Sequence, residues 1–209
     1  MTNPLYFAEK SAEAYDRWTL RVGNVECSVS IESWGRCVAF RGTEADFGDI
    51  LRDVRAVPWY DRDLGWCHAG FLKGARAIWP ILAPFTKNHD PTWFTGHSLG
   101  GALATLCAAM MVREGRAPAG LVTFGCPRVG FSLEGRLAGL PVRRYVHGAD
   151  CVPSHPWPIW GYRHAGAVTR LNGGRGIAEP DRFLDHKMAG YVAAVRMLGG
   201  RSYQARSLS

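Results

Sequence analysis

One serine stands in a pattern that can make a nucleophile, Gly96-His97-Ser98-Leu99-Gly100, or G-x-S-x-G. A short run, Pro91 to Thr95, precedes it, and a stretch of small and apolar residues, Leu99 to Val112, follows. These flanks predict a strand that ends in a tight turn and a helix that leaves the turn. Such a turn pushes the serine hydroxyl outward, where it can attack a carbonyl carbon.

A G-x-S-x-G pattern also arises by chance, so the interpretation depends on the neighbouring residues. A Cβ at Gly96 or Gly100 would collide with the adjoining strand or helix, which accounts for the two glycines. The small residues Gly101, Ala102 and Ala104 would let the helix lie close to a sheet.

A nucleophilic serine needs a histidine to take its proton and an acid to orient that histidine. After a motif of this kind, the acid and then the histidine follow the serine along the chain. Asp150 comes after the expected strand Val142 to Val146, and His186 lies at the start of the last expected helix. We therefore expect Ser98, Asp150 and His186 to form the catalytic set.

The other histidines and aspartates are weaker candidates. His147 and His155 lie too close to the candidate acid in sequence to be presented from another loop, and His164 falls within an expected strand as a structural residue. Asp181 and Asp185 follow no expected strand, and Asp185 is placed to cap a helix.

An acyl-transfer site also needs two backbone N–H groups directed at the developing oxyanion. Leu99, directly after the serine and at the start of a helix, offers the first, and the helix dipole adds to its effect. The second is expected from Thr43, in the stretch Phe40-Arg41-Gly42-Thr43-Glu44. The alternative for that stretch is a strand that ends in a glycine turn.

The elements that must position these residues alternate between helix and strand. Helices are expected over Ala8 to Trp18, Asp49 to Val54, Gly70 to Pro84, Leu99 to Val112 and Phe183 to Leu198. Strands are expected over Val25 to Glu32, Arg36 to Arg41, Pro91 to Thr95, Leu121 to Phe124, Val142 to Val146 and His164 to Thr169. This order predicts an α/β fold, with helices on both faces of a mainly parallel sheet and an antiparallel N-terminal hairpin at its edge. Ser98, Thr43, Gly125 and Asp150 would then meet at the carboxyl ends of the strands.

Six segments, in order along the chain, resemble the class 3 lipases, the α/β-hydrolase group that includes the filamentous-fungal triacylglycerol lipases. They are Phe40-Arg41-Gly42-Thr43, His68-Ala69-Gly70-Phe71, Gly96 to Ala102, Thr123 to Gly130, Gly148 to Pro153 and Asp185 to Tyr191. The resemblance implies Ser98 as nucleophile, Asp150 as acid, His186 as base, and the amides of Thr43 and Leu99 as oxyanion hole. It also implies hydrolysis of acyl esters with no metal or organic cofactor.

The segment Glu44 to Val57 corresponds to the place where this family often carries a short lid helix. Phe47, Ile50, Leu51 and Val54 give it an apolar face, but Asp46, Asp49, Arg52, Asp53 and Arg55 make it strongly charged. We therefore expect no strongly lipid-seeking lid here.

Length and charge set further limits. The 209 residues fit one domain, 1–209, and no apolar run approaches the length of a transmembrane segment. The net charge of +7 comes from scattered arginines, a pattern that argues against a nucleic-acid partner. Met1 to Leu20 shows no secretory pattern, which predicts a cytoplasmic protein, with a secreted, trimmed form as the alternative.

The six cysteines form no C-x-x-C pair, so neither a zinc site nor a redox motif is expected. Free thiols are the expectation, and a Cys27–Cys37 bridge across the first hairpin is the alternative.

The combined prediction is a serine carboxylic ester hydrolase, a lipase or esterase, that acts on an acyl ester or lipid. The alternatives are phospholipase A-type or acyltransferase chemistry with the same triad, or an inactive lipid-binding protein. Five aromatic side chains would line an acyl groove, touch a lipid surface or only pack loops: Trp59, Tyr60, Trp66, Trp157 and Trp160.

Overall fold

The centre of the fold is a sheet of seven strands, seen in the computed structural model, which describes residues 3–42, 57–87, 90–171 and 184–206. The strands, in sheet order, are β1 (Leu20–Val22), β2 (Val25–Glu32), β3 (Gly35–Phe40), β6 (Thr92–His97), β7 (Gly120–Phe124), β8 (Val142–His147) and β9 (Ala167–Leu171). The first three pair antiparallel, and the strands from β3 to β9 pair parallel. The predicted mainly parallel sheet with its antiparallel N-terminal hairpin is confirmed, and β1 is an additional strand that was not predicted.

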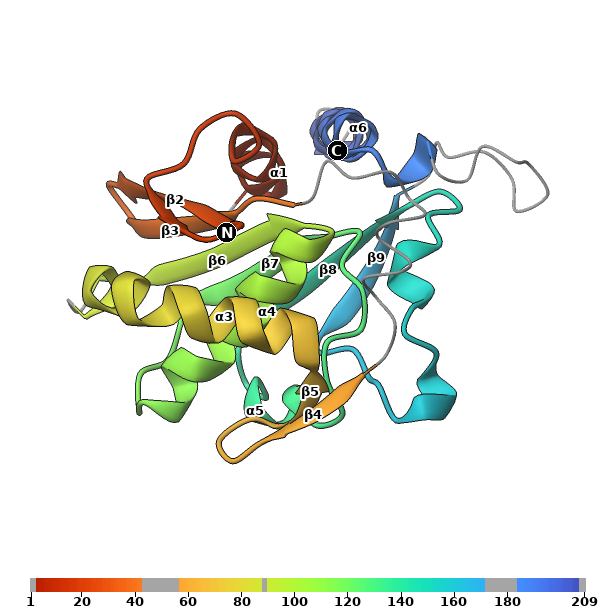
Figure 1. Cartoon of the computed structure of the whole chain (residues 1–209). Coiled ribbons are helices and arrows are strands. Elements are labelled where there is room, and N and C mark those ends of the chain that lie inside the picture. The colour runs from red at the N-terminus through yellow and green to blue at the C-terminus, as the bar shows by residue number, and fades with distance from the viewer. Residues whose placement is uncertain (1–2, 43–56, 88–89, 172–183, 207–209) are drawn as a thin grey trace.

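Helices cover both faces of this sheet, as predicted (Figure 1). On one face lie α1 (Pro4–Glu13) and α6 (Met188–Arg206), and on the other lie α3 (Ala69–Leu82) and α4 (Leu99–Arg113). A short helix, α5 (Leu133–Arg136), follows β7. No described helix is both long and apolar enough to cross a membrane.

The helix that leaves the serine turn is buried along nearly its whole length. Residues Gly100 to Met111 of α4 are all buried. A Cβ at Gly100 would overlap the Phe40 carbonyl oxygen of β3, and a Cβ at Gly96 would overlap the backbone of Gly100. The two glycines therefore let strand and helix meet backbone to backbone, which confirms their expected role.

The N-terminal helix begins and ends earlier than the predicted range Ala8 to Trp18. The Asn3 side chain accepts a hydrogen bond from the Leu5 amide at 3.0 Å, and Pro4 occupies the first turn. Both are helix-start signals, and they move α1 toward the N-terminus. Trp18 lies outside α1 and is 40% exposed.

Three other predicted elements are shifted. The last helix, predicted over Phe183 to Leu198, begins at Met188 and runs to Arg206. The predicted strand from His164 begins only at Ala167, because Gly166 adopts a left-handed φ of 82° just before it. The helix predicted from Gly70 runs through Pro80 and ends at Leu82, where a 3₁₀ turn, Ala83–Thr86, follows. The predicted helix Asp49 to Val54 lies outside the described residues.

A separate hairpin, β4 (Pro58–Asp61) and β5 (Gly65–His68), was not predicted. Its turn is closed by Asp61, whose Oδ1 accepts from the amides of Asp63 and Leu64, each at 2.9 Å. All six cysteines are free thiols, so the alternative Cys27–Cys37 bridge is not formed.

Candidate active site

Ser98 sits on a strained turn between β6 and α4. Its backbone adopts φ 55° and ψ −125°, the one left-handed φ among the described residues that are not glycine. The Ser98 amide donates to the Phe124 carbonyl at 3.0 Å, and its carbonyl accepts from the amide of Gly101, also at 3.0 Å. Such a conformation costs about 1–3 kcal/mol and persists only where the surrounding structure enforces it.

The Ser98 hydroxyl lies against the imidazole of His186, which approaches from a segment far away in the sequence. His186 Nε2 is 2.9 Å from Ser98 Oγ, and His186 Nδ1 is 2.8 Å from Asp150 Oδ2. Because a carboxylate accepts, we assign the ring proton to Nδ1, which leaves Nε2 free to take the hydroxyl proton. All three side chains are buried.

Asp150 is itself held by two further hydrogen bonds. Its Oδ1 accepts from the Val152 amide at 2.9 Å, and its Oδ2 accepts from the Tyr191 hydroxyl of α6 at 2.5 Å. Burial, together with the nearby charge of Asp150, raises the pKa of Tyr191 well above its ordinary value. Tyr191 therefore remains a neutral donor to the acid.

Gly125 leaves the space in which acid and imidazole meet. It follows β7 with φ 55°, and an added Cβ would lie 2.8 Å from Asp150 Oδ2 and 3.1 Å from the His186 ring. A glycine is therefore needed here, at the carboxyl ends of the strands, where Ser98 and Asp150 also lie.

The sequence pattern described as "Lipase (class 3)" matches residues 37–159, well over half of the chain. The chain belongs to the class 3 lipase family. Among curated proteins, it is 36% identical to a secreted mono- and diacylglycerol lipase of Fusarium solani, over 51% of this chain and 34% of that one. It is 39% identical to a secreted mono- and diacylglycerol lipase of Malassezia globosa, over 70% of this chain and 56% of that one.

The solved structures of this family share the fold. Rhizomucor miehei triacylglyceride lipase superposes with a TM-score of 0.66 at 24% identity, covering 82% of this chain and 80% of the other. The match to the Fusarium solani lipase covers only about a third of that protein's length. What this member of the class 3 lipase family hydrolyses therefore has to be argued from its own site.

The three rival histidines, all within the described residues of this class 3 lipase family member, are engaged elsewhere. The Nδ1 atoms of His147 and His155 lie 3.1 and 3.0 Å from the carbonyl oxygens of Asp185 and Cys151. His164 donates from Nε2 to the Pro153 carbonyl at 2.8 Å, and burial lowers its pKa to about 3. It precedes β9 rather than lying within it, but it has the structural role expected.

Asp185 does not act as the expected helix cap. It is buried in the 3₁₀ turn Leu184–His186, and its Oδ2 accepts from the Ala149 amide at 2.8 Å. This bond ties the turn that carries His186 to the loop that carries Asp150. Asp181 lies outside the described residues.

Of the two expected oxyanion donors, only Leu99 lies within the described residues. It is the first residue of α4, so its amide belongs to the helix turn whose N–H groups lack intrahelical acceptors. Thr43, the other expected donor, lies outside the described residues. So do Glu44 to Ala56, which make up nearly all of the segment in which no strongly lipid-seeking lid is expected.

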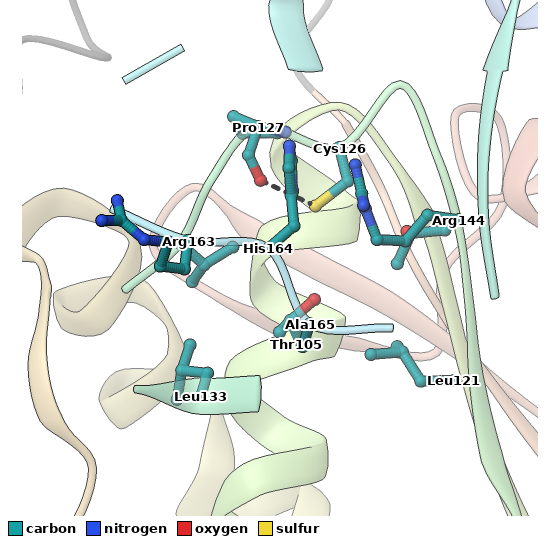
Figure 2. Close-up of a pocket in the computed structure, with 11 residues that line it drawn as sticks. Thr105, Leu121, Cys126, Pro127, Leu133, Arg144, Arg163, His164 and Ala165 are labelled. Carbon is teal, nitrogen blue, oxygen red and sulfur yellow. Dashed lines mark hydrogen bonds between the residues drawn. The ribbon is translucent and has the colours of Figure 1, made fainter. Parts of the chain in front are cut away.

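A small hollow beside the site is separate from the triad. Figure 2 shows the residues that line it, with the polar ends of Arg144 and His164 near the Cys126 thiol and with Leu121 and Leu133 lower in the view. Its volume is about 10 Å³, room for roughly one water molecule. Among the described residues, no cluster of three or more His, Cys, Asp or Glu side chains is arranged to hold a metal ion.

Proposed function

We propose that this chain hydrolyses carboxylic esters of lipids through an acyl-enzyme formed on Ser98. The observation that carries the proposal is the continuous contact from Ser98 Oγ to His186 Nε2 and from His186 Nδ1 to Asp150 Oδ2, at 2.9 and 2.8 Å. Both distances suit proton transfer and orientation of the base. Membership of the class 3 lipase family supports the choice of an ester as substrate.

In the first half-reaction, Ser98 Oγ attacks the ester carbonyl carbon while its proton passes to His186 Nε2. The negative carboxylate of Asp150 stabilises the imidazolium, and the amides of Leu99 and Thr43 would hold the oxyanion. The bond to the alcohol then breaks, and His186 donates its proton to the leaving oxygen.

In the second half-reaction, a water molecule gives a proton to His186 and attacks the acyl carbon. The acyl–oxygen bond to Ser98 breaks, the acid departs, and Ser98 Oγ recovers the proton from His186. Each turn of this cycle consumes one water and returns the enzyme unchanged.

Mono- and diacylglycerols are the substrate class that the names of the relatives suggest. Phospholipid hydrolysis and acyl transfer to an added alcohol use the same triad, so they differ only in substrate or acceptor. Analysis of the products from diacylglycerol, from phosphatidylcholine and from an ester with added alcohol separates these outcomes.

The direct test is reaction with a fluorophosphonate probe, since an activated serine displaces its fluoride. We expect stoichiometric labelling at Ser98 and turnover of p-nitrophenyl butyrate by the same preparation. Protein that is folded by circular dichroism but neither labelled nor active would reject the ester hydrolase and favour an inactive lipid-binding protein.

We also propose that the chain touches lipid through an aromatic surface made of Trp59, Tyr60, Trp66, Trp157 and Trp160. These side chains are 46–63% exposed. The hairpin β4–β5, at the lower edge of Figure 1, carries the first three. Indole rings suit a lipid–water interface because they are apolar with one polar atom.

The ring of Phe131 joins the two segments of this aromatic surface. It stacks on Trp66 at 6.2 Å, and a Cβ on Gly161, next to Trp160, would lie 2.9 Å from it. Packing of loops therefore explains part of the cluster but leaves the outer indole faces in water. Exposed Arg62 and Arg163 flank the aromatic surface and suit an anionic lipid surface.

We expect the double variant Trp59→Ser, Trp160→Ser to bind vesicles of phosphatidylcholine with phosphatidylglycerol about tenfold more weakly, since two lost indole contacts remove about 1–3 kcal/mol. Ile31→Ser is the matched control, because Ile31 is 80% exposed but lies on β2. Sedimentation with vesicles measures the binding. Equal loss in both variants would contradict a role for the aromatic surface.

A further inference from the structure

His97, the residue before the nucleophile, is a buried histidine that the proposed reaction does not use. It is 4% exposed, and its ring lies 4.6 Å from the ring of His186 at an angle of 34°. Its Nε2 is 2.6 Å from the His186 carbonyl oxygen, and its Nδ1 is 2.7 Å from the Tyr15 hydroxyl. Both nitrogens therefore have partners.

The direction of these two hydrogen bonds follows from chemistry. A carbonyl oxygen only accepts, so His97 Nε2–H donates to His186. Burial, and the neighbouring His186, lower the pKa of His97 well below its ordinary value, so the ring is neutral. A neutral imidazole with its proton on Nε2 accepts at Nδ1, so the Tyr15 hydroxyl is the donor.

The chain of bonds acts on His186, which lies in a short 3₁₀ turn rather than in a long helix or a strand. His186 ends the 3₁₀ turn Leu184–His186, just before α6 begins at Met188. A bond from His97 to its carbonyl ties this turn to the residue adjoining Ser98. The separation of Ser98 Oγ and His186 Nε2 therefore depends on His97 as well as on Asp150.

Tyr15 links this series of hydrogen bonds to Gly42, the residue before the expected oxyanion donor Thr43. The Tyr15 hydroxyl lies so close to Gly42 that a Cβ there would overlap it. The Tyr15 hydroxyl thus contacts Gly42, just after the end of β3, and also orients the imidazole of His97 next to Ser98.

We propose that Tyr15 and His97 are positioning residues, which hold the His186 backbone in place through the bonds Tyr15 Oη–H to His97 Nδ1 and His97 Nε2–H to the His186 carbonyl. This inference rests on the proposed ester hydrolysis. Neither residue touches the reacting atoms, so their effect is on the geometry of proton transfer.

The test compares variants that remove one or both of these bonds. We expect His97→Phe, which loses both bonds but keeps a planar ring, to lower kcat by about 10²-fold with little change in KM, as for a displacement of about 1 Å at the site. Tyr15→Phe should lower kcat less, by roughly three- to tenfold. In the double variant the Tyr15 change should add nothing, because its partner is gone.

Two further variants keep the proposal falsifiable if His97→Phe folds poorly. In His97→Gln, the side-chain NH₂ can reach the place of Nε2–H and should restore much of kcat, whereas His97→Asn is too short for this and should not. Tyr6→Phe is the matched control: it removes the hydroxyl of a different tyrosine, one on α1, which donates to Glu32 at 2.6 Å.

The rate of fluorophosphonate labelling is the second readout, because it reports activation of Ser98 without substrate binding. We expect it to fall in parallel with kcat. Full labelling and kcat in His97→Phe and Tyr15→Phe, with an active parent protein, would overturn the positioning role alone. A parent protein without labelling or activity would instead overturn the proposed function.

Discussion

Ser98→Ala is expected to lower kcat for p-nitrophenyl butyrate by about 10⁵-fold or more, because no other group can form the acyl-enzyme. His186 and Asp150 keep their positions in this variant but have no hydroxyl to deprotonate. Steady-state hydrolysis and fluorophosphonate labelling both measure the loss. Substrate binding should remain, since the oxyanion amides and the surrounding surface are unchanged.

Ser154→Ala is the control for this variant. Ser154 is an exposed serine in the 3₁₀ turn that follows the Asp150 loop, and we expect the parent kcat from it. Thermal unfolding shows whether each protein is folded. A folded Ser98→Ala protein with more than about a hundredth of the parent kcat would place the nucleophile elsewhere.

Asp150→Asn is expected to lower kcat by about 10⁴-fold, by inverting the tautomer of the base. The Val152 amide donates to Oδ1 at 2.9 Å, so an asparagine would keep its oxygen there and turn its NH₂ toward His186. An NH₂ group donates, which forces the His186 proton from Nδ1 to Nε2. His186 could then no longer accept the proton of Ser98.

The structure of this variant should otherwise be retained. The asparagine NH₂ takes the position of Asp150 Oδ2, and the Tyr191 hydroxyl can rotate to accept from it. We expect a small change in the unfolding midpoint beside the large loss of kcat. Labelling of Ser98 should slow by a similar factor, which separates lost activation from lost substrate binding. A kcat within tenfold of the parent would rule out Asp150 as the orienting acid.

The sequence predicted the sheet well because its strands have clear apolar runs and because helices alternate with them. Strand β2 begins and ends at the predicted residues, Val25 and Glu32. The hairpin β4–β5 was missed, because exposed aromatics such as Trp59 and Tyr60 give its short strands no alternating apolar pattern. The start of α1 at Pro4 was missed although Asn3 and Pro4 together are a recognisable start signal.

The residues proposed as the triad were predicted from their order along the chain, with Ser98 and Asp150 after strands and His186 at the start of the last helix. The residues that support them were not. Tyr191 and His97 entered the sequence analysis only as members of the segments Asp185 to Tyr191 and Gly96 to Ala102. Their partners lie 41 and 89 residues away, at Asp150 and His186, and no local spacing can reveal such pairs.

The backbone of Ser98 has a consequence for how this protein would evolve under artificial selection. Its φ of 55° is a conformation that glycine adopts without penalty, so Ser98→Gly should raise the resistance of the fold to heat. A library screened for thermal tolerance alone would therefore enrich glycine at this position. The most robust clones would be the inert ones, and only a selection that also demands turnover would keep the serine.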